Sequence, residues 1–447
     1  MRLRTFMAKF IGKFTYWFLQ IFFNGGSSLP GKLALKIDPT ILKILAKDYE
    51  IIVITGTNGK TLTTSLTANI LRQQFDYVLT NSTGSNMIQG IVSTFLNVKS
   101  KKKKKIAVLE IDEASLAKVT EDLNPKLFVF TNIFRDQMDR YGEIYTTYQM
   151  LLNGANKAPD ATILCNGDSP LFALCTTKNS QKFYGFNHLS DKEQMAHYNT
   201  EGVLCPKCQK ILHYKMITYA NLGKYYCSNC GFHRPQLDFC LSELKKVDNT
   251  SSAFVIDGMS LTLEVGGVYN VYNALAATAA SEYYQIPYEK IKAGLACNEK
   301  VFGRQEVISI YGKKVTIILV KNPVGINQAI DVVSRAPFSF TLVTLLNSQY
   351  ADGIDTSWIW DGNYEKLIKL NLPKIIVGGE RHKDMMRRII VAGVKTEKII
   401  DVDTNFKRLL NEIKIAPTEH IYIFTTYTAM LNLRKKLANA DFLKGKF

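Results

Sequence analysis

The chain has 447 residues, 46% of them hydrophobic, and a formal net charge of +17 at pH 7. This length and composition predict an ordinary globular protein of two or three domains, which excludes a disordered chain. The positive charge favours an anionic partner, and nucleic acid, an anionic membrane surface and a phosphorylated substrate all fit it. Lys99 and the lysines at 101–105 add to this charge, although such a run is usually a solvated loop.

Residues 2–21 have the periodicity of an amphipathic helix. One face would carry four polar residues, Arg2, Lys9, Lys13 and Gln20. The opposite face would be apolar, with Leu3, Met7, Phe10, Phe14, Trp17 and Ile21. The uninterrupted apolar stretch, residues 14–23, is shorter than the ~20 residues that span a bilayer. The segment therefore predicts a helix that either lies in a membrane interface or packs on the body of the protein.

A glycine loop follows the first predicted strand, residues 51–54. Its sequence is Thr55-Gly56-Thr57-Asn58-Gly59-Lys60-Thr61, and a helix is predicted directly after it at residues 62–71. The two glycines allow backbone N–H groups to approach a phosphate chain, Lys60 supplies a cation, and the hydroxyl of Thr61 suits Mg²⁺. The loop is shorter than the consensus P-loop, because only Thr57 and Asn58 separate its two glycines. We nevertheless predict a site for a nucleotide triphosphate.

Carboxylates end the next predicted strand, residues 106–110, with Glu110, Asp112 and Glu113 in close succession. A parallel sheet places the carboxyl ends of neighbouring strands at one edge, which is where Mg²⁺ ligands sit beside a P-loop. Solvated acids at a helix N-terminus would give a similar pattern. Beside the glycine loop we favour a metal site, with Glu113 as a ligand.

Two CxxC pairs, Cys205/Cys208 and Cys227/Cys230, are separated by 18 residues. Two such turns can bring four thiolates to about 2.3 Å from a tetrahedral Zn²⁺. We predict a structural zinc ribbon inserted at about residues 200–235, because four thiolates leave no position for a catalytic water. A pair of disulfides in a secreted domain is the alternative, but no cleavable signal peptide precedes this region, which favours a reducing cytoplasm.

Strand-like apolar runs alternate with helix-length segments along most of the chain. The runs are residues 51–55, 106–110, 127–131 and 161–165 before the cysteines, and 315–320, 340–346, 375–378 and 421–425 near the C-terminus. The pattern predicts an α/β fold with a parallel sheet in the P-loop domain and a second, Rossmann-like α/β domain. We place an N-terminal helical segment at residues 1–47, the nucleotide-binding domain at 48–301 and the C-terminal domain at 302–447.

Five motifs occur in the order found in Mur ligases, over roughly residues 35–440. They are the glycine loop, Glu113-Ala114-Ser115, the stretch at 131–140 with Asp136 and Asp139, Asn273-Ala274-Leu275-Ala276-Ala277, and Phe302-Gly303-Arg304. The chain therefore resembles the Mur ligase family, whose members use ATP to activate a carboxylate as an acyl phosphate that an amine then attacks.

The resemblance assigns roles to individual residues. It implies ATP and Mg²⁺, with Lys60 and Thr61 holding phosphates and Mg²⁺ and Glu113 as a Mg²⁺ ligand. It also implies that Asn273 contacts adenine and that Arg304 approaches the nucleotide from the domain junction.

Departures from the usual family pattern narrow the comparison. Only about fifty residues precede the P-loop strand, so the usual domain that holds a UDP-sugar is missing. Gln137 stands where the family's histidine helps bind a second Mg²⁺, and Lys157 does not fall where its carbamylated lysine would. With the CxxC insert, these features resemble the family's subunits that amidate the D-glutamate of lipid II to D-isoglutamine. Such a subunit takes ammonia from a class I glutaminase, whose nucleophile motif is not apparent in this chain.

The resemblance implies a heterodimer with that glutaminase, a lipid-linked substrate, no nucleic acid, and a place in the cytoplasm at the inner face of the plasma membrane. Two other functions stay open at this point. A folylpolyglutamate synthase-like ligase of the same fold would show glutamate-dependent ATP turnover. A zinc-ribbon ATPase that binds nucleic acid would be stimulated by DNA or RNA, with an affinity that falls steeply with salt.

Asp355 belongs to a polar stretch, residues 347–361, that follows the predicted strand at 340–346. Loops at the ends of α/β strands commonly carry function. By the resemblance, Asp355 reaches the partner and orients the histidine of the partner's Cys-His pair, which completes a shared triad. The alternative is that Asp355 caps the helix that holds Trp358 and Trp360, because Asp is a favoured N-cap residue.

Overall fold

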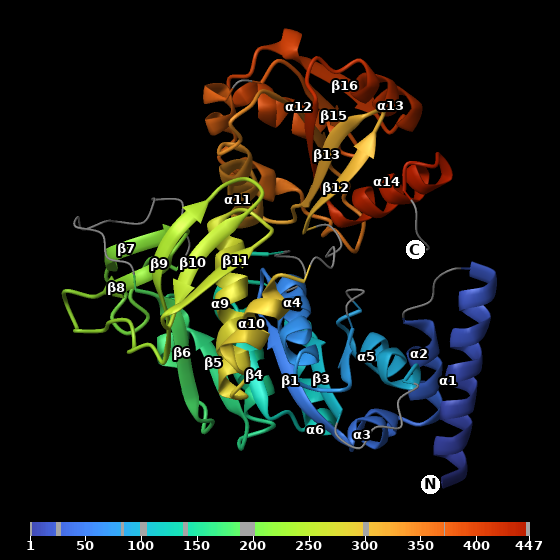
Figure 1. Cartoon of the computed structure of the whole chain (residues 1–447), viewed down its shortest axis with the longest axis vertical. Helices are drawn as coiled ribbons and strands as arrows, with labels where there is room; N and C mark the ends of the chain where they lie inside the picture. Colours follow the sequence, from blue (N-terminus) through green and yellow to red (C-terminus); the bar gives the residue numbers. More distant parts are fainter. Residues whose placement is uncertain are drawn as a thin grey trace.

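The computed structural model of the chain describes residues 2–23, 28–81, 85–98, 105–136, 142–187, 202–297, 304–370 and 372–443. The lysines at 99–104 and the predicted domain boundary near residue 302 lie outside these ranges. The described residues form two large β-sheets flanked by helices, one sheet above the other in Figure 1. An N-terminal helix lies at one side of the molecule, and a small hairpin lies at the other. The predicted α/β fold class is confirmed.

The first sheet has nine strands in the order β11-β10-β9-β6-β5-β4-β1-β3-β2. From β2 to β9 in that order the strands are parallel, and β10 and β11 extend the sheet in antiparallel fashion. Their bounds are β1 Tyr49–Thr55, β2 Val78–Thr80, β3 Lys105–Glu110, β4 Leu127–Phe130, β5 Thr162–Asn166, β6 Gln181–Phe186, β9 Phe239–Val247, β10 Ser252–Ile256 and β11 Met259–Leu263.

Helices cover both faces of this sheet, because side chains alternate between the two faces along each strand. On β1, Ile52 and Ile54 belong to one buried cluster, whereas Ile51 and Val53 belong to another. The first cluster includes residues of α4 (Lys60–Arg72), α9 (Val268–Tyr283) and α10 (Tyr288–Leu295). The second includes residues of α2 (Leu29–Ile37), α3 (Ile41–Ala46), α5 (Ile88–Leu96), α6 (Leu116–Leu123) and α8 (Ile144–Ala155).

The second sheet has six strands in the order β12-β13-β17-β14-β15-β16, and all except β12 are parallel. The strands are β12 Arg304–Ile310, β13 Lys313–Leu319, β14 Phe340–Leu345, β15 Ile375–Gly378, β16 Ile399–Asp403 and β17 His420–Thr425. Residues of α11 (Pro323–Val333) and α12 (His382–Val391) pack on one face, and residues of α13 (Phe406–Lys414) and α14 (Tyr427–Asn439) pack on the other.

The two sheets meet where their parallel strands end. Asn58, in the loop after β1, exchanges side-chain hydrogen bonds of 3.0 and 3.3 Å with Asn322, which follows β13. The neighbouring Lys321 forms an ion pair with Asp136, beyond the end of β4. The carboxyl ends of strands from both sheets therefore line one cleft, which is where open α/β sheets bind ligands.

A separate hairpin lies between β6 and β9 in the chain. It consists of β7 (His213–Tyr219) and β8 (Leu222–Tyr226), which pair in antiparallel fashion. In Figure 1 it lies beside β6 and β9, at the side of the first sheet that is far from α1 (Arg2–Phe23). The insertion predicted from the cysteines is therefore a hairpin attached to the first sheet.

Helix α1 packs on the body through small residues. Ala8 and Gly12 are buried, and a Cβ atom on Gly12 would lie 2.6 Å from Cδ1 of Leu96. The Thr5 hydroxyl donates a 2.7 Å hydrogen bond to Oδ2 of Asp38. The large apolar residues of α1 are instead exposed, namely Leu3, Phe6, Met7, Phe10, Phe14, Trp17, Phe18 and Ile21. The helix thus contacts the body, but the predicted apolar face points away from it.

Candidate active site

The glycine loop joins β1 to α4 in a conformation that only glycine allows at two positions. Gly56 has φ of 122° and Gly59 has φ of 88°. A Cβ atom on Gly56 would lie 2.4 Å from the hydroxyl oxygen of Thr131, and one on Gly59 would lie 2.1 Å from Oδ1 of Asn273. Close packing, as well as the backbone angle, therefore requires glycine at both positions.

Residues beyond β4 hold this loop in place. The Thr57 hydroxyl donates to the carbonyl of Phe134 at 3.2 Å and accepts from its N–H at 3.1 Å. The N–H of Asn58 donates to Oδ1 of Asn132 at 2.9 Å, and the hydroxyl of Thr131 donates to the Asn58 carbonyl at 2.8 Å. Neither Asn132 nor Phe134 was singled out from the sequence, although both lie in the motif that begins at Thr131.

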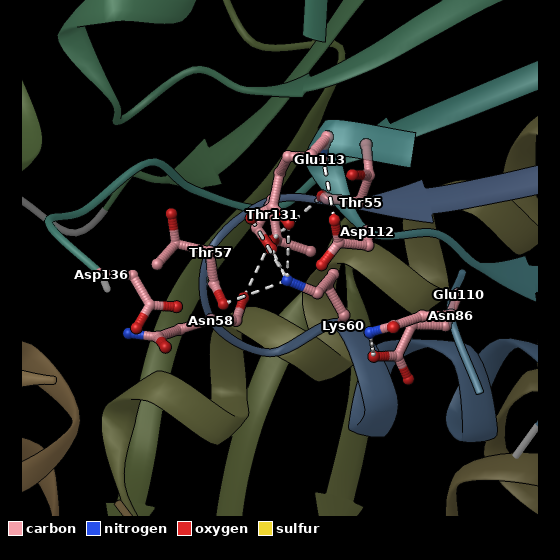
Figure 2. A network of polar contacts seen from close by, with 12 residues as sticks. Thr55, Thr57, Asn58, Lys60, Asn86, Glu110, Asp112, Glu113, Thr131 and Asp136 are labelled. Atoms are coloured by element: carbon pink, nitrogen blue, oxygen red, sulfur yellow. Dashed lines mark hydrogen bonds and ion pairs between the residues drawn. The ribbon is translucent and has the colours of Figure 1, made fainter. Parts of the chain in front are cut away.

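Lys60 is buried at the start of α4, and its ammonium group lies at the centre of the network in Figure 2. It donates to the Gly56 carbonyl at 2.6 Å and to both carboxylate oxygens of Glu113 at 3.1 and 3.2 Å. Burial alone would lower the pKa of Lys60, but the Glu113 carboxylate and the further acids nearby outweigh burial and raise that pKa. Burial raises the pKa of Glu113, against the opposing effect of Lys60. The predicted residues Lys60 and Glu113 are thus brought together.

Two more carboxylates approach this pair. Glu110, the last residue of β3, accepts a 3.2 Å hydrogen bond from Asn86, while its Oε2 is buried without a hydrogen-bond partner among the described residues. Asp136 pairs with Lys321 through Oδ2, and its Oδ1 is likewise buried without a described hydrogen-bond partner. Buried carboxylate oxygens without donors are costly, and they suit a hard cation.

Asp112 differs from these acids. It accepts a 3.1 Å hydrogen bond from the N–H of Ala114 and caps the short 3₁₀ helix η1 (Glu113–Ser115). The alternative considered from the sequence, acids at a helix N-terminus, therefore applies to Asp112.

A pocket lies beside the glycine loop, between the two sheets, and its space not filled by atoms, which includes space open to solvent, is about 650 Å³. Its lining combines amide side chains with aromatic rings and a lysine, and includes Asn58, Asn132, Tyr219, Tyr269, Asn270, Asn273, Lys321 and Gln328. Flat rings and amides suit a planar, hydrogen-bonding base. Asn273 is buried here, with its Oδ1 3.4 Å from the Thr63 hydroxyl.

The remaining predicted residues of the nucleotide site are less fully defined. Thr61 is half-buried at the second position of α4. Arg304 begins β12, but its side chain lies outside the described part of the structure, as do Gln137 and Asp139. Lys157 is exposed and forms a 2.6 Å ion pair with Glu121. Lys321 and Asn322 were not singled out from the sequence, although they directly follow the predicted strand at 315–320.

The four cysteines of the two CxxC pairs converge at one end of the hairpin. Their sulfur atoms all lie within 4.8 Å of one another, and Cys205–Cys230 and Cys208–Cys227 are each separated by 3.5 Å. These separations are too long for disulfides, whose S–S bond is about 2.05 Å. Four ligands about 2.3 Å from a tetrahedral metal would be about 3.8 Å apart, which agrees with the cluster. The predicted convergence of the four thiolates is confirmed.

Asp355 lies on the surface of the second domain, in the loop after β14. Its carboxylate accepts 2.8 Å hydrogen bonds from the N–H and the hydroxyl of Ser357, at the start of the 3₁₀ helix η3 (Ser357–Asp361). The buried Asp352 anchors the same loop by accepting a 2.7 Å hydrogen bond from the N–H of Thr428. Asp355 therefore makes a local contact with the first residue of η3, one position before the N-cap residue Thr356, and its carboxylate remains exposed to solvent.

Family models match both domains. Residues 54–281 match the Mur ligase middle domain, and residues 319–430 match the MurT ligase C-terminal domain. The fold is also similar to that of MurF from Acinetobacter baumannii, with a TM-score of 0.65 and 16% identity over 91% of this chain and 80% of that one. At that identity the similarity shows the fold alone.

Two relatives match nearly the whole chain. The MurT subunit of lipid II isoglutaminyl synthase (glutamine-hydrolysing) from Streptococcus pneumoniae R6 is 50% identical, over 99% of both chains. The subunit of the same name from Staphylococcus aureus COL is 36% identical, over 85% of this chain and 86% of that one. The chain belongs to the MurT family of Mur ligases.

Proposed function

We propose that the chain is the ligase subunit of a lipid II isoglutaminyl synthase, which converts the D-glutamate of the lipid II stem peptide to D-isoglutamine. The observation that carries this proposal is the 50% identity to the pneumococcal subunit along 99% of both chains. That relative is part of a glutamine-hydrolysing synthase, so a glutaminase partner is implied. The buried glycine loop and carboxylates supply what carboxylate activation requires.

The proposed reaction has two steps. An oxygen of the D-glutamate α-carboxylate attacks the γ-phosphorus of ATP, and ADP leaves. Neutral ammonia then attacks the acyl carbon, phosphate leaves, and the nitrogen loses a proton to give the amide. Lys60 and the N–H groups of the glycine loop would offset negative charge on the transferring phosphoryl group, and the pocket beside Asn273 would hold the adenine.

Magnesium would be held by oxygen donors close to Lys60 and the glycine loop. Thr61 and Glu113 are the ligands we expect from the sequence, and the partnerless buried oxygens of Glu110 and Asp136 fit a further demand for hard donors. The cation would offset charge on the ATP phosphates. Three of these four side chains, Glu110, Glu113 and Asp136, are buried, at the end of β3, in η1 and beyond the end of β4.

The cysteine cluster fits a structural zinc ion. Four sulfur donors match zinc better than magnesium or calcium, and a closed set of four leaves no position for a substrate. We expect one zinc per chain by elemental analysis. The double variant Cys205→Ser, Cys208→Ser should lose zinc and thermal stability; retention of both would rule out the zinc ribbon.

The loop that carries Asp355 would bind the glutaminase, which we expect to resemble GatD, in a heterodimer. Three large side chains around it are strongly exposed, namely Tyr350, Ile354 and Trp360. Aromatic residues of this kind are enriched where proteins bind one another. The hydrogen bonds of Asp352 to Thr428 anchor the loop beneath these side chains. Asp355 would then meet the partner's histidine in a fixed position.

The whole proposal is tested by co-expressing the chain with candidate glutaminase subunits. Lipid II is incubated with the purified complex, ATP and glutamine, and its stem peptide is then analysed by mass spectrometry. We expect a decrease of about 1 Da, the exchange of a hydroxyl for an amino group, at the D-glutamate. Amidation that requires no ATP, or glutamate addition in place of amidation, would contradict the proposal.

Asp355→Asn separates the two roles suggested for Asp355. Asn retains most capping ability but lacks the charge that orients a histidine. We expect loss of glutamine-dependent amidation with retention of amidation from added ammonium. Asp384→Asn, at a half-buried aspartate of α12 that is paired with Arg381, is the control and should retain both activities. Full glutamine-dependent turnover in Asp355→Asn would leave only the capping role.

A peripheral contact of α1 with an anionic membrane would bring the chain to a lipid-linked substrate. None of the helices in the described ranges has the length and hydropathy that a membrane span requires. The eight exposed apolar residues of α1 form a face that water disfavours, and Lys9 and Lys13 belong to the same helix. Apolar side chains with neighbouring cations suit the headgroup region of an anionic bilayer.

Vesicle sedimentation tests this contact. The complex should bind vesicles that contain phosphatidylglycerol and bind phosphatidylcholine vesicles less, and Phe10→Glu with Phe14→Glu should abolish binding. Val391→Glu with Ile415→Glu introduces the same charge at exposed apolar residues of the second domain and should leave binding intact. If the α1 variant binds as well as wild type, α1 does not contact the membrane.

The two other functions considered from the sequence lack comparable support. The Streptococcus pneumoniae and Staphylococcus aureus relatives are named as subunits of lipid II isoglutaminyl synthase, and neither is named as a folylpolyglutamate synthase or a nucleic-acid-binding ATPase. A DNA- or RNA-stimulated ATPase activity of the complex would reopen the second of these.

A further inference from the structure

The hairpin that carries the cysteine cluster is inserted tip first into the first domain. Its cysteines flank the open end, before β7 and after β8, whereas Tyr219 and Leu222 pair at the tip. Both tip residues are buried and belong to the same apolar cluster as α4 and α9. The cysteines thus close one end of the hairpin, and the other end is part of the domain core.

Tyr219 connects this tip to the nucleotide site. Its ring lies 5.9 Å from that of Phe134 and 5.7 Å from that of Tyr272, and the residue lines the pocket beside Asn273. The backbone of Phe134 makes the two hydrogen bonds that hold Thr57 of the glycine loop. A short path of direct contacts therefore runs from the hairpin through Tyr219 and Phe134 to the loop.

A saturated ion pair fixes the hairpin in this position. Asp168 and Arg234 are both buried and form a 2.7 Å ion pair. Asp168 also accepts a 2.6 Å hydrogen bond from the hydroxyl of Tyr272, and its carbonyl accepts a 3.0 Å hydrogen bond from the N–H of Gly223 near the tip. The Tyr272 hydroxyl in turn lies 2.9 Å from that of Thr218 on β7. The tip consequently has little freedom to move relative to α9, which carries Tyr272.

We infer that the tip of the cysteine hairpin, through Tyr219, forms part of the wall of the nucleotide pocket, and that Tyr219 positions the glycine loop and the nucleotide base. This rests on the proposed ATP site and adds to it a structural element outside the P-loop. Tyr219 is a positioning residue, because it lines the base pocket and reaches the glycine loop through Phe134. Its loss should weaken nucleotide binding and leave the chemical step nearly unchanged.

The experiment compares Tyr219→Leu, Tyr219→Phe and Tyr226→Leu in the complex with the glutaminase subunit. Affinity for ATP is measured by calorimetry, and KM and kcat are measured separately. Tyr219→Leu should weaken binding and raise KM for ATP about five- to tenfold, with kcat within about twofold. Tyr219→Phe keeps the ring and should behave like wild type. Tyr226→Leu removes a ring from the same hairpin near the cysteine end and should leave ATP affinity unchanged.

The outcomes separate this inference from the proposed function. If wild type does not bind ATP, the proposed function fails and the inference fails with it. If wild type binds ATP and Tyr219→Leu binds it equally well, only the inference is overturned, and the same holds if Tyr226→Leu is weakened as much. Should Tyr219→Leu lose zinc or fail to fold, Phe134→Leu decides the matter, because it breaks the same path outside the hairpin and should give the same rise in KM.

Linkage supplies a second readout that does not depend on turnover. If the tip of the hairpin forms part of the wall of the pocket, ATP and the metal stabilise the same arrangement, and each must favour the binding of the other. Release of zinc to a colorimetric chelator should therefore be slower with ATP present, and this protection should be lost in Tyr219→Leu. Equal release rates of wild type with and without ATP would contradict the coupling.

Discussion

In the described part of the first domain, two ion pairs are buried, Lys60–Glu113 and Arg234–Asp168, and their surroundings differ. Arg234 and Asp168 are surrounded by donors and acceptors that suit them, since Asp168 also accepts from the Phe186 N–H at 2.8 Å and from the hydroxyl of Tyr272. Near Lys60, by contrast, two buried carboxylate oxygens have no hydrogen-bond partner among the described residues.

This difference separates a structural pair from a site that takes a ligand. A pair whose donors and acceptors are bonded within the protein stabilises one arrangement and has no donor or acceptor left for a ligand. A pair beside partnerless oxygens and a glycine loop carries a cost that a cation and phosphates could relieve. Breaking each pair should therefore have opposite consequences, one for turnover and the other for stability.

The largest effect is expected for Lys60→Ala. Turnover should fall by on the order of 10³-fold or more, because the cation that offsets phosphoryl charge is lost. Burial raises the pKa of both Glu113 and Asp168. Stability should fall less than when the Arg234–Asp168 pair is broken, because Glu113 can take up a proton once Lys60 is gone, whereas hydrogen bonds from the Phe186 N–H and the Tyr272 hydroxyl favour the charged form of Asp168. Amidation assays and thermal unfolding measure the two quantities. Lys157→Ala, at an exposed lysine, should affect neither.

Arg234→Leu should show the reverse pattern. Removing one partner of a buried ion pair leaves an uncompensated charge on Asp168 and costs about 3–5 kcal/mol. The loss should appear as easier opening of the hairpin, measured by hydrogen exchange at the N–H of Gly223, which donates to the Asp168 carbonyl. Adding Asp168→Leu should recover part of the loss. If the hairpin of the double variant opens more easily still, the hydrogen bonds around the pair contribute more to hairpin stability than the charge of the pair does.

How much of this could be predicted depends on the range of the contacts. The glycine loop, the CxxC pairs and the central strands are local patterns, and the sequence predicts them because one short segment contains the whole signal. The ion pair between Asp136 and Lys321 could not be predicted, because it depends on how the two domains face each other across the cleft. The same is true of Tyr219, which lies far in sequence from the loop that it supports.

The N-terminal helix shows a different limit. Its periodicity predicts which residues share a face, and those residues do share one. Periodicity does not say which face packs on the protein, and here small residues such as Ala8 and Gly12 make the contact. Leu96 and α2 pack against the small residues of α1, and only this tertiary contact shows that the apolar face is left exposed.

Glu110→Gln should have an intermediate effect that tests whether partnerless oxygens mark a metal site. The amide keeps the shape but is a weaker ligand for a hard cation, so the Mg²⁺ concentration needed for half-maximal turnover should rise about 10- to 100-fold. Asp112→Asn is the matched control, because Asp112 caps η1 and Asn caps nearly as well. Equal Mg²⁺ requirements for the two variants would remove Glu110 from the proposed site.

The smallest effect concerns Glu282 on α9, another carboxylate with a buried oxygen that has no described hydrogen-bond partner. No cation is recorded beside it among the described residues, and burial, followed by repulsion from Asp257, raises its pKa to about 7. In the unfolded chain this carboxyl loses its proton near the ordinary glutamate pKa of 4.5. The folded protein therefore holds one more proton than the unfolded chain between pH 4.5 and about 7, and the contribution of Glu282 to stability falls across that window as pH rises.

Glu282→Gln should remove this fall. At pH 8 the variant should unfold at a slightly higher temperature than wild type, whereas at pH 4.5 the two should differ little. Melting temperatures at four or five values between pH 4.5 and 8 measure the difference, and turnover at pH 8 should be unchanged. A partnerless carboxylate without a neighbouring cation or glycine loop is thus expected to be only a cost to stability. If Glu282→Gln changed the Mg²⁺ requirement as Glu110→Gln should, a partnerless oxygen alone would mark a ligand site, and the contrast drawn between the two ion pairs would fail.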